Sequence, residues 1–171
     1  MKTQARIGRI LLIIGRVALG ALFIYAAYAK MKPLANLHWS VGAVRISLGV
    51  FAMQVDSFGL LPPWAVHFIA YALPPFELFL GLWLVTGILL RYSSLITTLL
   101  LAGFFGVLIH AYALGQEISC GCFGPGEHIG PERLLIESCF FALSLAVTIG
   151  AFVAHRRGST ALPEAFPVES R

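Results

Sequence analysis

Charged residues are scarce in this chain: only 12% of its 171 residues are Asp, Glu, Lys or Arg, against about 25% in soluble globular domains. Hydrophobic residues make up 58%, which is more apolar surface than one water-soluble domain of this length can bury. The basic residues form no patch or stripe, so the net charge of +4 does not indicate binding to nucleic acid. The composition therefore predicts an integral membrane protein, with the lipid bilayer surrounding most of the chain.

The apolar segments lack the alternation of polar and apolar residues that is typical of membrane barrel strands. They are continuous instead, and a helix of about 20 such residues crosses a hydrocarbon core roughly 30 Å thick. We predict an all-α fold, a single four-helix transmembrane domain over residues 1–157, followed by a flexible tail over residues 158–171. The predicted spans are about residues 7–29, 64–90, 93–114 and 132–154.

Two segments leave alternatives open. The first apolar run has a basic start and the sequence Ala27-Tyr28-Ala29, so it also fits a cleavable signal peptide, although Arg16 interrupts it. Between Pro33 and Pro62, apolar residues recur at helical spacing with charged residues among them. We predict a helix at about residues 38–56, lying at the membrane interface between the first and second spans, with a re-entrant segment or a fifth span as alternatives.

Lys and Arg are absent from the connection between Gly115 and Pro131. Basic residues gather instead at three other places. The N-terminal tail carries Lys2, Arg6 and Arg9, Arg91 follows the second span, and the fourth span ends at Arg156 and Arg157. The positive-inside rule then predicts cytoplasmic termini and an outer location for this connection, although Lys30, Lys32 and Arg45 oppose it. In the inner membrane of a bacterium, the connection would face the periplasm, an oxidising compartment.

Cysteine is rare, with three residues in the chain, but two of them lie in this connection as Cys120-Gly121-Cys122. A disulfide needs Cα atoms within about 6.8 Å, and Gly121 permits the bent backbone that brings such a pair together. A ring this small is strained, and strained disulfides are labile. The spacing fits a redox-active pair, a static disulfide or two free thiols. We predict no metal site, because Cys139 lies in a helix and His110 and His128 are the only further ligand types close in sequence.

Ionisable residues inside apolar runs are costly and are functional candidates. Glu77 follows Pro74-Pro75, which predicts a bend or a break in the helix. A continuous span would place Glu77 deep in the membrane, whereas a helix starting at Pro75 would place it near the outer face and Lys30. A structural ion pair or hydrogen bond and a direct catalytic role are both consistent with Glu77.

Four further polar residues carry separate expectations. Arg16 is expected to extend to the inner headgroups, with an ion pair to an acidic residue as the alternative. His110, near the end of the third span, fits either stabilisation of a thiolate or an interfacial hydrogen bond. Glu137 follows Arg133 by four residues, so we expect an ion pair on one helix face. Cys139 is expected to be a buried small residue of the fourth span, with a resolving thiol as the alternative.

Several of these residues together resemble the MauE/DoxX family of redox-associated membrane proteins. The resemblance covers roughly residues 10–155, and Cys120-Gly121-Cys122-Phe123-Gly124 before a last helix is its most specific part. The other matching pieces are Arg16-x3-Gly20-x2-Phe23 with Lys30, Leu60-Leu61-Pro62 and Leu73-Pro74-x2-Glu77-x3-Gly81. The segment between Lys32 and Asp56 looks longer than the usual pattern.

The resemblance implies thiol–disulfide chemistry outside the cytoplasm, with a thioredoxin-like periplasmic protein as the partner. We predict a membrane relay in which Cys120 and Cys122 support the oxidation or maturation of periplasmic proteins. The supporting polar residues would be Glu77, His110, Lys30 and Arg16. Analogy with other four-helix disulfide-forming membrane proteins suggests a membrane quinone as electron carrier, although the sequence contains no quinone motif. The alternatives are a non-enzymatic assembly scaffold with a structural cysteine pair and a small-solute transporter.

Overall fold

A computed structural model describes residues 2–33, 38, 40–115 and 130–159. These residues form five helices and no strand: α1 (Lys2–Met31), α2 (Val41–Ser57), α3 (Pro63–Thr86), α4 (Leu90–Ala113) and α5 (Pro131–Ser159). Four are long and apolar enough to cross a membrane, over Ile10–Met31, Pro63–Thr86, Leu90–Ala113 and Pro131–His155. The predicted all-α membrane fold is therefore confirmed, with α2 as the additional helix between the first and second spans.

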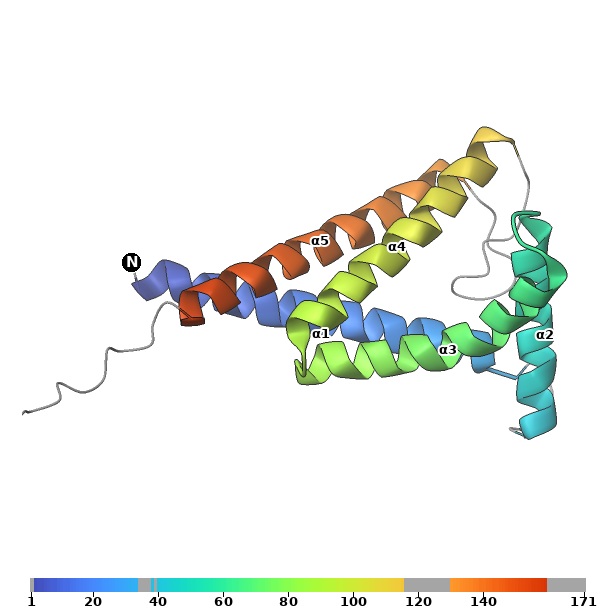
Figure 1. Cartoon of the computed structure of the whole chain (residues 1–171), viewed down its shortest axis with the longest axis horizontal. Helices are drawn as coiled ribbons and strands as arrows, with labels where there is room; N and C mark the ends of the chain where they lie inside the picture. Colours follow the sequence, from blue (N-terminus) through green and yellow to red (C-terminus); the bar gives the residue numbers. More distant parts are fainter. Residues whose placement is uncertain (1, 34–37, 39, 116–129, 160–171) are drawn as a thin grey trace, which may run out of the picture.

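The four long helices are arranged as two pairs (Figure 1). α1 packs along α3 and α4 packs along α5, while α3 and α4 diverge from the short turn that joins them. One cluster of buried side chains takes residues from all four helices, namely Leu19, Phe23, Leu80, Leu84, Leu101 and Val147. α2 runs across the direction of α1 and α3 at the end where the pairs spread apart. The two pairs therefore lie close together at one end and diverge toward the end that carries α2 (Figure 1).

Glycine allows α1 and α3 to approach closely. A Cβ atom added to Gly20 would lie 2.8 Å from the carbonyl oxygen of Gly81, and one added to Gly81 would lie 2.8 Å from that of Gly20. Small residues at a helix crossing let membrane helices gain packing energy from backbone contact. This pair of glycines fixes the depth at which α1 meets α3.

The second span continues through its two internal prolines. α3 has Pro63 at its first position and ends at Thr86, and Gly87 after it, with a φ of 76°, forms a left-handed C-cap. Figure 1 shows α3 changing direction along its length, as helices with internal proline do. Glu77 lies 14 residues after Pro63 and nine before Thr86, about 21 Å and about 14 Å from the two ends of the helix. Of the two alternatives, the structure therefore has the one in which Glu77 is deep in the membrane.

The two ends of the bundle differ in charge. The start of α1 and the end of α5 lie at one end, and the α3–α4 turn lies on the same side of the bundle, nearer its middle (Figure 1). Seven basic residues belong to the helical segments there, and these described segments contain no acidic residue; the seven are Lys2, Arg6, Arg9, Arg16, Arg91, Arg156 and Arg157. The other end carries α2, the end of α4 at Gly115 and the start of α5 after Gly130.

Candidate functional site

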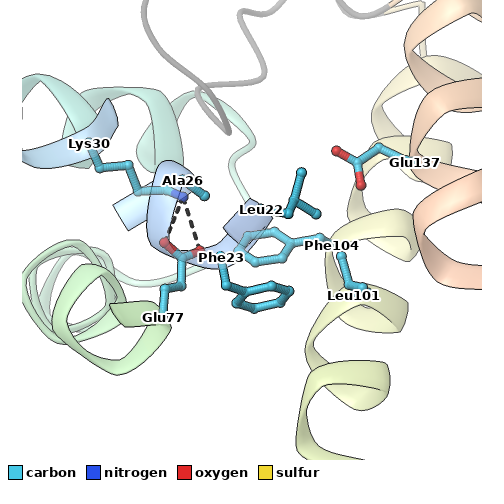
Figure 2. Close-up of a pocket in the computed structure, with 8 residues that line it drawn as sticks. All are labelled: Leu22, Phe23, Ala26, Lys30, Glu77, Leu101, Phe104 and Glu137. Atoms are coloured by element: carbon cyan, nitrogen blue, oxygen red, sulfur yellow. Dashed lines mark hydrogen bonds and ion pairs between the residues drawn. The ribbon is translucent and has the colours of Figure 1, made fainter. Parts of the chain in front are cut away.

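A buried ion pair joins α1 to α3. The Nζ atom of Lys30 lies 2.9 and 3.0 Å from the two carboxylate oxygens of Glu77, and the side chains are only 2% and 3% exposed. Side chains in a helix lean toward its N-terminus, so Lys30 in the last turn of α1 reaches back to the level of Glu77 (Figure 2). The same ammonium lies 5.4 Å from the ring centre of Phe51 in α2, a cation–π contact. Lys30 therefore connects three helices.

A third ionisable side chain faces this pair. Glu137 of α5 lines the same small cavity as Lys30 and Glu77, and it is 4% exposed (Figure 2). The cavity has a volume of about 30 Å³, and a water molecule needs roughly 10–15 Å³ by this measure, so there is room for about two. Its apolar lining consists of Leu22, Phe23, Ala26, Leu101 and Phe104. Two carboxylates and one ammonium are thus gathered inside the bundle.

Glu137 also forms the predicted ion pair along its own helix. Its Oε1 atom accepts a hydrogen bond of 3.1 Å from a guanidinium nitrogen of Arg133, which confirms the i, i+4 interpretation. The spacing to Arg133 gave no sign that Glu137 lines the same cavity as Glu77. The available signal was its position inside an apolar span, where a carboxylate is expected to turn inward.

A second and larger cavity lies next to the charged one. Its volume is about 400 Å³, and α2, α3 and α4 provide most of its walls. Lys30 is the one charged residue among the described residues that line it, and all the others are apolar. Lys30 and Phe104 line both cavities, so these two side chains stand between the apolar and the charged space.

The sequence matches the family model described as methylamine utilisation protein MauE over residues 8–151. The chain belongs to the MauE family. No curated protein and no solved structure matches it. The matched region contains Lys30, Glu77 and Glu137 as well as the Cys120-Gly121-Cys122 sequence. Family membership agrees with the four membrane-spanning helices and describes a membrane protein of the methylamine-utilisation type.

Two predicted supporting residues of this MauE-family chain lie apart from the charged cavity. The guanidinium of Arg16 packs against Gly87 at the α3–α4 turn, and its buried Nε atom has no hydrogen-bond partner among the described residues. Arg16 therefore belongs to the opposite end of the bundle. His110 is exposed in the last turn of α4 and lines neither cavity. Its link to a thiolate stays a prediction.

The cysteines divide into two groups. Cys120 and Cys122 lie outside the described residues, so their pairing stays a prediction. Cys139 is exposed on α5, and the prediction that it is buried is wrong. The buried face of α5 is formed by Glu137, Ser144, Val147, Thr148 and Ala151, and this rotation of the helix turns Cys139 outward. In the described part of the chain, no group of three or more His, Cys, Asp or Glu could hold a metal ion.

Proposed function

We propose that this MauE-family protein is a membrane thiol–disulfide redox protein that uses Cys120 and Cys122 to support the oxidation or maturation of periplasmic proteins. The observation that carries the proposal is a coincidence of two features at one end of the bundle. The connection containing the cysteine pair follows α4, which ends at Ala113, and precedes α5, which begins at Pro131. Lys30 of the buried Lys30–Glu77 pair lies in the last turn of α1, and Glu137, which lines the same cavity, lies six residues after the start of α5 at Pro131.

The distribution of charge supports an outer location for the cysteine pair. Seven basic residues and no acidic ones belong to the described helices at the opposite end. At the end that carries α2, the described segments contain as many acidic as basic residues, four of each. The basic residues are Lys30, Lys32, Arg45 and Arg133, and the acidic residues are Asp56, Glu77, Glu132 and Glu137. Positive charge is retained on the cytoplasmic side, so both termini are proposed to be cytoplasmic and the cysteine pair periplasmic.

Thiol–disulfide exchange defines the chemistry of the proposed partner. A thiolate of a periplasmic thioredoxin-like protein attacks one sulfur of the Cys120–Cys122 disulfide and forms a mixed disulfide. The second thiol of the partner then attacks this mixed disulfide, which leaves the partner oxidised and the Cys120–Cys122 pair reduced. Two electrons and two protons have then moved to this chain, and a membrane electron carrier has to remove them before the next cycle.

Single cysteine variants test the proposal. Cys120→Ser or Cys122→Ser leaves one thiol and no disulfide for the partner to reduce. The remaining thiolate can attack the disulfide of the oxidised partner, which releases one partner thiol and forms a mixed disulfide. Since this chain has no second thiol to resolve the link, the mixed disulfide should appear on non-reducing gels. Cys139→Ser is the matched control, because this cysteine lies exposed on α5 and belongs to neither cavity.

The outcomes separate the redox function from its main rival. A mixed disulfide with one of the single variants, absent from the double variant and from Cys139→Ser, supports the redox function. Loss of the protein itself in both single variants indicates a structural disulfide and an assembly scaffold. Normal protein levels with no mixed disulfide and unchanged oxidation of periplasmic proteins contradict the redox function.

A further inference from the structure

The apolar cavity between α2, α3 and α4 has the size and lining of a small-molecule site. Its volume of about 400 Å³ falls within the roughly 300–1,000 Å³ that such sites occupy. Phe51 and Phe58 from α2 and its C-terminal cap, Leu73 from α3, and Phe104 from α4 form much of the wall. A mainly apolar cavity with one polar group at a defined place is the usual design of a ligand site. Here the polar group is the ammonium of Lys30.

The cavity lies within the membrane span. Along α4 its lining extends from Leu99 to Leu108, nine and 18 residues after Leu90. These positions are about 14 and about 27 Å along the helix from the α3–α4 turn. Lys30 meets Glu77 at a comparable depth, more than half-way along α3. A phospholipid whose charged headgroup reached Lys30 would carry that charge into the hydrocarbon, which is costly.

The charge balance at Lys30 selects the kind of head that fits. Glu77 already compensates the ammonium at 2.9 Å, so the pair is neutral as a unit. An anionic head would add an uncompensated charge at this depth, whereas a neutral head with carbonyl oxygens would not. Flat rings also pack favourably among phenylalanine side chains, and Phe51, Phe58 and Phe104 line the cavity. The fitting ligand is thus neutral, planar, carbonyl-bearing and soluble in lipid.

We infer that the cavity lined by Phe51, Leu73 and Phe104 binds a membrane quinone, with the quinone head toward Lys30 and its hydrocarbon tail along α3 and α4. The choice of a quinone rests on the proposed redox function, which needs a two-electron acceptor in the membrane. Oxidation of the Cys120–Cys122 dithiol to the disulfide releases two electrons and two protons, and reduction of one quinone to the quinol takes up both. The adjacent charged cavity, with Glu77 and Glu137, offers carboxylates through which the protons can pass.

Two glycines of α4 provide a matched test of binding. Gly103 lines the cavity, and a Cβ atom added there meets no atom within 4 Å, so Gly103→Leu adds an apolar side chain at the cavity wall without a clash at its Cβ. Gly106 lies one turn further along α4, is equally open to an added Cβ and does not line the cavity, so Gly106→Leu is the control. The probe is decyl-substituted ubiquinone, and the protein is the full chain in phosphatidylcholine nanodiscs, with empty nanodiscs as the blank.

We expect Gly103→Leu to weaken binding of the quinone by about tenfold or more and Gly106→Leu to leave it unchanged. Equal binding by both variants, or wild-type binding no stronger than that of empty nanodiscs, overturns the inference; in the second case lipid alone fills the cavity. A Cys120→Ser/Cys122→Ser double variant separates the two proposals, because quinone binding needs no thiol. If the protein binds the quinone but no mixed disulfide forms in the trapping experiment, only the redox function is contradicted. If a mixed disulfide forms but the protein does not bind the quinone, only the quinone site is contradicted.

Discussion

Removal of one partner of the Lys30–Glu77 pair should destabilise the bundle far more than removal of both. Glu77→Leu leaves the ammonium of Lys30 in a site where that side chain is 2% exposed. Breaking a buried ion pair in this way costs about 3–5 kcal/mol, because the remaining charge loses the counter-ion that contacts it directly. At about 2–4 °C per kcal/mol for a chain of this size, the midpoint of thermal unfolding should fall by roughly 6–20 °C.

The double variant Lys30→Met/Glu77→Leu distinguishes this reasoning from a simple packing defect. It removes both charges and keeps apolar side chains of similar size, a replacement that is often neutral. We expect it to recover most of the loss caused by either single variant, in a thermal unfolding series on the detergent-solubilised protein. Glu132→Leu is the control, because Glu132 is exposed in the first turn of α5 and should change stability by less than about 1 kcal/mol. A double variant as unstable as the sum of the two single variants would refute the buried-charge explanation.

Three further predictions concern packing and exposure. Gly81→Ala places a Cβ 2.8 Å from the carbonyl oxygen of Gly20 and should lower the stability by about 1–3 kcal/mol. In the control Gly106→Ala the added Cβ meets open space, so this variant should be neutral or slightly stabilised. Equal melting temperatures of the two variants would contradict the close α1–α3 contact. Thr98 and Thr148 share a buried hydroxyl–hydroxyl hydrogen bond of 2.9 Å between α4 and α5, so Thr98→Val should cost about 0.6–1.7 kcal/mol by thermal unfolding, and no loss would show that the bond contributes nothing. Cys139, exposed on α5, should react in membranes with a lipid-soluble maleimide faster than with a charged one, and the reverse order would place it outside the lipid.

The helices could be predicted because their signal is local. Long apolar runs give the four spans, and apolar residues at helical spacing give α2. The structure begins α2 at Val41, after the N-cap Ser40, whose side chain accepts a hydrogen bond of 3.1 Å from the backbone N–H of Ala43. The path of α3 was harder to predict from the sequence, because Pro74 and Pro75 are compatible with a break in the helix or with a bent continuous helix. The choice depends on neighbouring helices that support the backbone, and these are not readable from the proline sequence.

The candidate site was predictable only in part, because helix rotation is set by tertiary packing. The sequence marked Lys30 and Glu77 as costly residues in apolar runs, and the structure joins them in one ion pair. For Glu137 the sequence predicted an ion pair with Arg133 on the same helix. The i, i+4 spacing does not tell whether that helix face points into the bundle or toward the lipid. Packing of α5 against α1 and α4 turns Glu137 inward and Cys139 outward. The apolar cavity depends on the divergence of α3 from α4, which has no signal in either helix alone.

The redox state of Cys120 and Cys122 in intact cells tests the central proposal most directly. Cells are labelled with a membrane-impermeant thiol reagent, with and without prior reduction, in Cys139→Ser protein so that only this pair reports. We expect a mixture of reduced and oxidised pairs, labelled from outside, whose ratio shifts with added oxidant or reductant. A pair that stays fully bridged or fully reduced under both treatments would contradict a working redox pair on the outer face.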